Sequence, residues 1–244
     1  MNTNLLSQVS IILVQPAGAL NVGSVARVMK NMGLEKLILV NPQCDRNSEA
    51  AKLMAVHAND ILERAIVVDS LEMALQGCHH AIATTARSRS VNTPLETPQT
   101  ALPWLLADNL KSALIFGPEE RGLSNLELAF AQKFVCIPAN PEYPSLNLAQ
   151  AVAVCAYELY QATQQIDLPQ SSVIPAAIEQ LEGYYQDLQA MLLKIGYLYP
   201  HTAESRMEKF RRLYNRNALS SEEVAMLRGI IRQVDWAISQ KQQD

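Results

Sequence analysis

Short, continuously apolar runs alternate with helix-like segments as far as Tyr160, and this alternation constrains the fold more than any other feature of the chain. The apolar runs predict strands at Ser10–Val14, Leu37–Val40, Ala65–Val68, Ala81–Thr84, Ala113–Phe116 and Phe134–Ile137. Helical spacing predicts helices at Val22–Met32, within Ala51–Ala65, and at Leu71–Leu75 and Leu148–Tyr160. Strands that are apolar throughout are typical of a parallel sheet covered on both faces. We therefore expect an α/β domain with a parallel sheet over residues 1–162.

The composition changes after this domain. Segment 163–175 is polar and contains two prolines, which predicts a linker. Residues 176–244 show helical periodicity without a clear strand, so we expect a small all-α appendage of two or three helices. One stretch of the appendage gathers basic side chains, namely Arg206, Lys209, Arg211, Arg212 and Arg216. A solvated helix face and a phosphate-binding patch both fit this spacing.

Bulk composition narrows the possible functions. The formal net charge is -4, so any nucleic-acid site is expected to be a local basic patch on an acidic body. The four cysteines form no CxxC pair and most lie in apolar runs, which predicts reduced thiols without zinc or disulfides. The first residues show no secretory leader, and no apolar stretch is long enough to span a membrane. We expect a cytoplasmic protein.

The segment Asn21–Arg27 follows the first predicted strand and contains Gly23. Free backbone amides at the start of the following helix could hold a phosphate. The GxGxxG spacing of a dinucleotide site is missing, and Asn41-Pro42 stands where such a site needs an acidic residue for the ribose. A nicotinamide-dependent enzyme is therefore disfavoured.

Two further loops follow predicted strands. Phe116–Ser124 places two glycines around Glu-Glu-Arg, and Ile137–Leu148 uses three prolines to deliver Ser145 and Asn147 to the start of the last helix. Because open α/β sheets bind ligands at the carboxyl ends of their strands, both loops are candidates for a binding site.

These three segments resemble, in the same order, the three signature motifs of the 2′-O-methylating branch of the SPOUT class of RNA methyltransferases. The segment Thr84–Arg89 and the helical tail resemble, more narrowly, the TrmJ subfamily. That resemblance implies methylation of a cytidine or uridine ribose at the first nucleotide of the tRNA anticodon loop. It also implies S-adenosylmethionine as cofactor, tRNA as partner, a homodimer and a sheet with a deep C-terminal trefoil knot.

The resemblance assigns expected roles to particular residues. Arg27, Ser145 and Asn147 are expected at the reacting groups. The residues expected around the cofactor are Thr84, Thr85, Ala86, Gly117, Glu119, Ile137, Ser145 and Leu146. The residues expected to contact RNA are Asn21, Arg87, Arg89, Tyr143, Arg206, Lys209, Arg211 and Arg212.

The chemistry sets limits on these roles. The methyl donor is already activated, so no metal is expected. A guanidinium is a poor general base, so the conservative role for Arg27 is to donate hydrogen bonds to the 2′-oxygen or to the adjacent phosphate. Two alternatives stay open: an rRNA 2′-O-methyltransferase of the same class, and a non-catalytic RNA-binding module that has lost its cofactor. Only the Thr84–Arg89 segment and the tail favour tRNA, whereas the intact motifs argue against loss of catalysis.

Overall fold

The computed structural model of the chain describes residues 5–86, 94–164, 174–215 and 219–241. Contacts within the chain divide it into two compact units, residues 1–171 and 172–244. Each unit has a hydrophobic core of its own. The units are therefore described separately.

A parallel sheet forms the centre of the first unit. Its described strands run in the order β3-β2-β1-β6-β4-β7-β5, and each pairs with its neighbours in parallel. The strands are β1 (Val9–Val14), β2 (Lys36–Val40), β3 (Ile66–Val68), β4 (His80–Thr84), β5 (Leu95–Glu96), β6 (Ser112–Phe116) and β7 (Lys133–Val135). β1 and β6 are buried along their whole length, as expected for central strands of a sheet covered on both faces.

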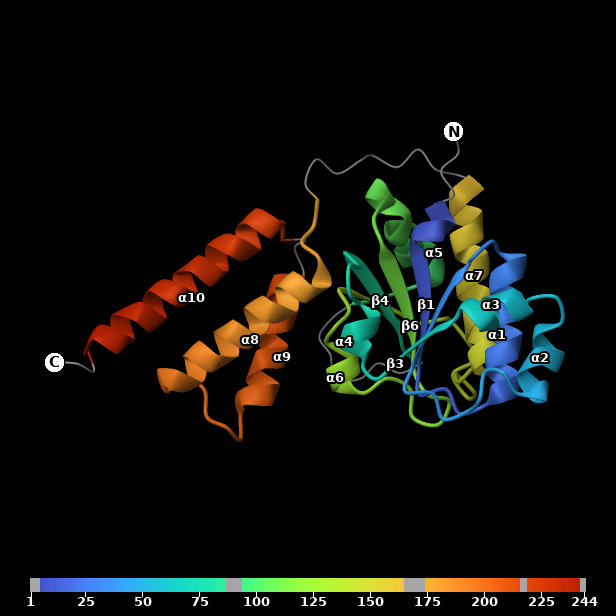
Figure 1. The fold of residues 1–244 in the computed structure, drawn as a ribbon, viewed down its shortest axis with the longest axis horizontal. Coiled ribbons are helices and arrows are strands. Elements are labelled where there is room, and N and C mark those ends of the chain that lie inside the picture. The colour runs from blue at the N-terminus through green and yellow to red at the C-terminus, as the bar shows by residue number, and fades with distance from the viewer. Residues whose placement is uncertain (1–4, 87–93, 165–173, 216–218, 242–244) are drawn as a thin grey trace. The chain divides into compact units, whose positions relative to one another are not determined.

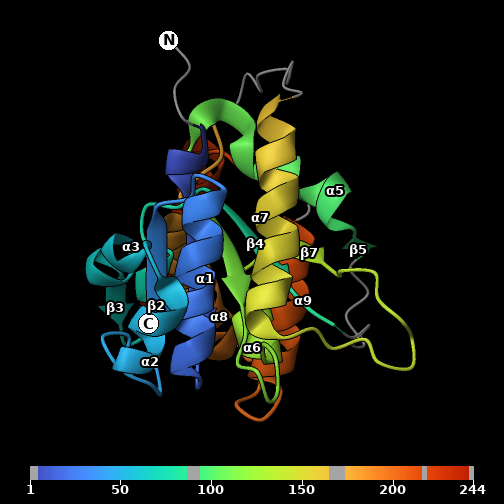
Figure 2. The same ribbon diagram turned by 90° about the vertical axis from the view of Figure 1, so that its right-hand side faces the viewer.

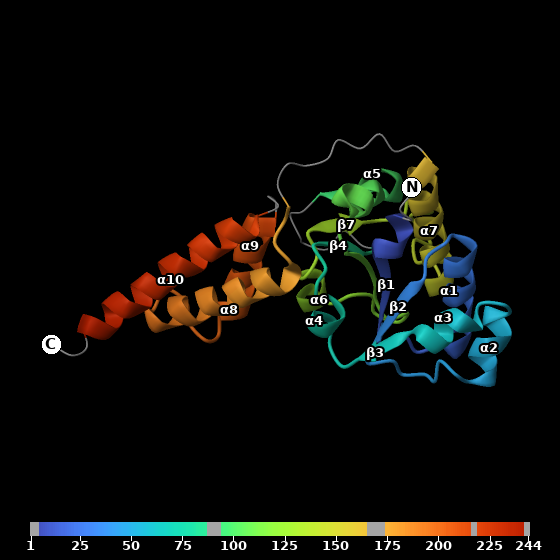
Figure 3. The ribbon, with the colours of Figure 1, turned by 45° about the horizontal axis from the view of Figure 1, so that its top comes forward.

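Helices cover both faces of this sheet. They are α1 (Ala19–Asn31), α2 (Glu49–Ala55), α3 (Asn59–Arg64), α4 (Leu71–Ala74), α5 (Pro98–Ala101), α6 (Asn125–Leu128) and α7 (Leu148–Gln164), with 3-10 helices η1 (Leu5–Gln8) and η2 (Leu102–Asn109). Figures 1 and 3 show α1, α2, α3 and α7 on one side of the strands and α4 and α6 on the other. On the first side α1 and α7 pack next to each other (Figure 2).

The predicted architecture of an α/β domain with a parallel sheet and a helical C-terminal part is confirmed, and its strands lie where the apolar runs predicted them. Some boundaries were wrong, and one strand was missed. β7 ends at Val135 instead of Ile137, and α1 begins at Ala19 instead of Val22. The two-residue strand β5, which pairs with β7, was not predicted.

The second unit consists, in its described part, of α8 (Ile178–Lys194), α9 (Ala203–Asn215) and α10 (Ser221–Lys241). Its core is built around Tyr184 and Tyr185, each about 2% exposed, with aliphatic side chains from all three helices. A backbone bridge between Pro175 and Ser220 connects the segment before α8 to the start of α10. None of the helices in the described parts of the chain combines the length and apolar character needed to cross a bilayer.

Candidate functional site

A cavity of about 540 Å³ opens at the carboxyl ends of β4, β6 and β7. The loops that follow these strands line it, together with the start of α7. All eight residues expected around a cofactor lie on its wall: Thr84, Thr85, Ala86, Gly117, Glu119, Ile137, Ser145 and Leu146. The fold thus brings three distant loops to one site.

The loop after β6 folds back tightly on itself. A Cβ atom on Gly117 would lie 2.3 Å from the amide nitrogen of Leu123, so no larger residue fits there. Gly122, with φ of +67°, adopts a left-handed conformation and its amide donates to the Pro118 carbonyl over 2.9 Å. The two glycines therefore allow this loop to form one wall of the cavity.

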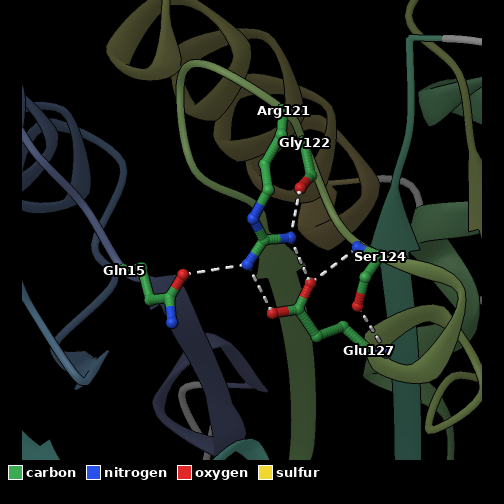
Figure 4. A network of polar contacts seen from close by, with 5 residues as sticks. All are labelled: Gln15, Arg121, Gly122, Ser124 and Glu127. Atoms are coloured by element: carbon green, nitrogen blue, oxygen red, sulfur yellow. Dashed lines mark hydrogen bonds and ion pairs between the residues drawn. The ribbon is translucent and has the colours of Figure 1, made fainter.

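Arg121 ties this loop to two other elements (Figure 4). Its guanidinium binds both carboxylate oxygens of Glu127 at 2.9 and 3.0 Å and donates to the Gln15 side chain, just after β1, over 2.9 Å. Ser124 and Glu127 form a capping box at the start of α6. The capping pair of Ser124 and Glu127 was not predicted, although the Ser-x-x-Glu spacing is a recognisable helix-start signal in the sequence.

Asn21, at the first turn of α1, connects all three motif loops. Its side-chain nitrogen donates to Glu119 over 2.8 Å, and its side-chain oxygen accepts from Asn147 over 3.0 Å. Asn147 in turn caps α7, because its side-chain oxygen accepts from the Ala149 amide over 2.9 Å. The structure thus gives Asn21, which was expected at the RNA, a positioning role between motifs.

Glu119 accepts further hydrogen bonds from the backbone amides of Ala17 and Gly18, at 3.1 and 3.3 Å. Its partial burial opposes ionisation, but the hydrogen bonds from Asn21, Ala17 and Gly18 outweigh that cost and hold the pKa of Glu119 below its ordinary value. The carboxylate is therefore ionised at neutral pH and organises the loop that carries it.

This geometry corrects the expectation that free amides near Gly23 hold a phosphate. Gly23 lies inside α1, and the preceding residue, Val22, already bonds to the Gly18 carbonyl. The anion at this helix start is the protein's own Glu119.

The loop between β7 and α7 lies between two cavities. Tyr143 is 80% exposed and lines a second hollow of about 620 Å³, to which Ser145 and Leu146 also contribute. Ser145 therefore lies where the two hollows meet, accessible from both.

Arg27 is exposed on α1 and is not among the residues that line either cavity. It follows Asn21 by six residues, about 9 Å along the helix axis. The resemblance groups Arg27 with Ser145, yet only Ser145 lines these cavities. Arg87 and Arg89 lie outside the described residues.

The basic residues of α9 fall into two groups. Arg206 and Lys209 are exposed. Arg211 is bound through both guanidinium nitrogens by the buried carboxylate of Glu182, with one distance of 2.7 Å, and Arg212 donates to the Glu208 carbonyl. The expectation that Arg211 is available to RNA is therefore corrected, because removing its charge would leave Glu182 buried without a partner.

The cysteines and the possible metal ligands do not form a second site among the described residues. The four cysteines are not paired in disulfides; Cys78 and Cys155 are buried, whereas Cys44 and Cys136 are half-buried. Nowhere in the described ranges do three or more His, Cys, Asp or Glu side chains gather to hold a metal.

Comparison with known proteins identifies the class. The model of the SpoU rRNA Methylase family matches residues 8–157, and the chain belongs to this family. The model of the tRNA methyltransferase TrmJ C-terminal domain matches residues 179–243.

Whole-chain relatives narrow this further. The chain is 41% identical to the tRNA (cytidine/uridine-2′-O-)-methyltransferase TrmJ of Pectobacterium atrosepticum, covering 94% of this chain and 98% of the relative. It is 40% identical to the tRNA (cytidine/uridine/adenosine-2′-O-)-methyltransferase TrmJ of Pseudomonas aeruginosa, covering 93% of each chain. The crystal structure of TrmJ from Z. mobilis ZM4 superposes with a TM-score of 0.83 at 35% identity over 93% of this chain and 98% of that one. The chain therefore belongs to the TrmJ branch, and the expected resemblance is confirmed.

Proposed function

We propose that this RNA methyltransferase transfers a methyl group from S-adenosylmethionine to the 2′-hydroxyl of a cytidine or uridine in tRNA, at the first nucleotide of the anticodon loop. The observation that carries the proposal is the meeting of the loops after β4, β6 and β7 at one cavity, with Asn21 of the first motif hydrogen-bonded to Glu119 and Asn147 of the other two motifs. Membership of the TrmJ branch supports the tRNA substrate.

The cavity fits the cofactor. Its volume of about 540 Å³ lies within the range of small-molecule sites, and its wall combines apolar side chains with loop backbone. Bound S-adenosylmethionine supplies a sulfonium methyl group that is already activated for transfer. Thr84, Thr85, Ala86, Gly117, Ile137 and Leu146 would hold this group. Glu119 would contribute to cofactor binding indirectly, by anchoring the loop that forms one wall of the cavity.

The chain's own residues then position the ribose. Ser145, which is reached from both hollows, would hold the ribose hydroxyls, and Tyr143 would contact the nucleotide from the second hollow. Positioning of this kind contributes up to about 7–11 kcal/mol in the best cases. Arg27 would donate hydrogen bonds to the 2′-oxygen as negative charge develops on it.

We place Arg27 in the site of a second copy of the chain. Arg27 lies outside both cavities of its own chain, yet it shares the exposed side of α1 with Leu20, which is 54% exposed. On the neighbouring α7, Tyr157 and Tyr160 are 48% and 41% exposed. A homodimer that buries these side chains would bring each Arg27 toward the partner's cavity. The deep C-terminal trefoil knot expected for the class and a cytoplasmic location belong to the same proposal.

Methyl transfer can be tested directly with purified protein, radiolabelled S-adenosylmethionine, and tRNA and rRNA transcripts. We expect label in tRNA only, and mass spectrometry of nuclease digests should map it to the ribose of the first anticodon-loop nucleotide. A transcript with a 2′-deoxy nucleotide at that position should accept no methyl group. Label in rRNA, or at a tRNA base, would contradict the proposal.

The shared site can be tested by mixing two inactive variants, Arg27→Ala and Ser145→Ala. In a mixed dimer one cavity keeps Ser145 and receives an intact Arg27 from the partner, whereas the other cavity lacks both side chains. Each mixed dimer should therefore regain roughly half the activity of a wild-type dimer. If Arg27 acts within its own chain, both sites of the mixed dimer stay defective and no activity returns. The Arg27→Ala dimer alone should keep its affinity for S-adenosylmethionine.

A further inference from the structure

The turn between α8 and α9, at residues 195–202, exposes an unusual number of aromatic rings. Figure 1 shows this turn as the orange loop that connects the two helices. Tyr197 and Tyr199 are 52% and 56% exposed, and His201 is also exposed. A single exposed ring is ordinary, but several exposed rings close together in one turn mark a candidate interaction surface.

The backbone of the turn holds these rings outward. Leu198, which is 2% exposed, anchors the turn in the core of the second unit. The amides of Tyr197 and Leu198 both donate to the Leu192 carbonyl over 3.0 Å, and the amide of Thr202 donates to the Tyr199 carbonyl over 2.9 Å. Because Tyr197 and Tyr199 flank the buried leucine, the turn presents two rings to solvent at little further cost in conformational entropy.

One cation lies beside the rings. The guanidinium carbon of Arg206 lies 5.8 Å from the centre of the Tyr197 ring, which also packs against Phe210 with centroids 6.4 Å apart. On the other side of Leu198, the rings of Tyr199 and His201 stack with centroids 6.0 Å apart and an interplanar angle of 22°. Flat rings next to cations are the combination with which proteins bind unpaired nucleic acid strands.

The charges of α9 are separated by face. At 3.6 residues per turn, Arg206 and Lys209 lie within about 60° of each other around the helix, and about 100° or more from both Glu204 and Glu208. Arg211 does not add to this face because it binds Glu182. The side of α9 next to the rings is therefore positively charged, although the whole chain is acidic.

We propose that the turn between α8 and α9 is a stacking site for unpaired nucleobases of an RNA strand, in which Tyr197 and Tyr199 contact bases and Arg206 and Lys209 contact the adjoining phosphates. The inference deepens the proposed function and rests on it, because the unpaired loops of tRNA supply such a strand. It adds sequence-tolerant recognition of single-stranded RNA to a unit that is separate from the cavity.

The test uses the full-length protein and a fluorescently labelled short oligoribonucleotide, either single-stranded or annealed to its complement. Replacing Tyr197 and Tyr199 together by leucine should weaken single-strand binding about tenfold or more, because a stacked ring is lost at each position. The double phenylalanine variant keeps both rings and should bind like the wild type. Trp236→Leu, which removes a 59% exposed ring from α10, is the matched control and should also bind like the wild type.

The salt dependence of RNA binding distinguishes the contribution of the rings from that of the charges. The leucine pair should keep the wild-type slope of log affinity against log salt, whereas Arg206→Ala with Lys209→Ala should reduce that slope by roughly 0.7 per lost contact. Binding of the annealed duplex should change little in the leucine pair. Thermal melting followed by circular dichroism checks that each variant is folded.

Unchanged single-strand binding in the leucine pair would overturn the stacking site, and so would equal losses in the phenylalanine and leucine pairs. Methyl transfer to tRNA by the same proteins keeps this result apart from the proposed function. If the wild type methylates tRNA but the leucine pair binds RNA normally, only the stacking site fails. If the leucine pair loses RNA binding while the wild type transfers no methyl group, only the proposed function fails.

Discussion

At the scale of single residues, Asn21 determines how the three motif loops meet. Replacement by alanine removes hydrogen bonds to Glu119, which lines the cavity, and to Asn147, which caps α7. Partly buried groups that lose their partners cost about 1–3 kcal/mol, so the free energy of unfolding should fall by that amount, together with the affinity for S-adenosylmethionine. Urea unfolding and calorimetry measure the two effects. Asn31→Ala, an exposed site in the last turn of the same helix, is the control. Equal effects of the two variants would remove the bridging role.

His80 is a second residue with a measurable consequence. It is 2% exposed at the start of β4, its ring lies 4.1 Å from that of Trp104, and its Nδ1 has no hydrogen-bond partner among the described residues. Burial lowers the pKa of His80 from 6.5 to about 4. The unfolded chain therefore takes up this proton first as the pH falls, so the stabilising contribution is complete above pH 6.5 and is lost on acidification toward pH 4.

The loss attributable to His80 between these pH values is about 3 kcal/mol at most. A His80→Leu variant no longer carries the titrating group, so its free energy of unfolding should fall less steeply than that of the wild type between pH 6.5 and 4.5. Urea unfolding at several pH values gives both curves. A leucine variant of the exposed His57 should follow the wild-type curve. Parallel curves for His80→Leu and wild type would show that the ring is not buried as described.

At the scale of elements, Gly23 fixes the approach of α1 to α2. A Cβ atom at Gly23 would lie 2.1 Å from the Ala51 carbonyl oxygen, which belongs to backbone and cannot rotate away. Gly23→Ala should therefore destabilise the first unit by about 3 kcal/mol, since α1 must shift and carries Asn21 and Arg27 with it. Gly229 on α10 has nothing within 4 Å of its Cβ position, so Gly229→Ala should instead stabilise by about 0.5–1 kcal/mol. Chemical denaturation gives the free energy of unfolding of both variants. A destabilisation of equal size in both would contradict the close contact between α1 and α2.

Which elements the sequence could predict depends on how local their causes are. β1 and β6 were predicted because their residues are apolar throughout and need only two covering layers. The start of α1 was misplaced because Gly18 provides no side-chain cap, and the carboxylate that satisfies this helix start comes from Glu119, about a hundred residues away. β5 was missed because two residues carry no periodicity and form a strand only by pairing with β7.

The same reasoning applies to the candidate site. The second and third motifs and the Thr84–Ala86 segment predicted which residues surround the cavity, because each follows a strand and parallel strands end at one edge. They did not predict the Asn21 bridge or the Arg211–Glu182 pair, since both depend on distances between helices rather than on spacing along the chain. The separation of Arg27 from the cavity of its own chain likewise required coordinates.

At the scale of the whole molecule, the two units divide the proposed work. No residue is shared between the cores of the two units. Every residue that lines the cavity at the ends of β4, β6 and β7 belongs to the first unit. The exposed cations Arg206 and Lys209 belong to the second. Cofactor binding and tRNA affinity should therefore be separable by dividing the chain.

A fragment of residues 1–171 should fold and bind S-adenosylmethionine with the affinity of the full chain, while its affinity for tRNA falls roughly tenfold or more. The salt dependence of tRNA binding should also flatten, because each lost phosphate contact lowers the slope by about 0.7–0.9. Calorimetry with the cofactor and anisotropy with labelled tRNA measure the two affinities, and circular dichroism reports whether the fragment is folded. A folded fragment that does not bind the cofactor would mean that the second unit completes the cavity. A fragment that binds tRNA with an unchanged affinity and salt slope would assign recognition to the first unit alone, and the exposed cations of α9 would then be ordinary solvated surface.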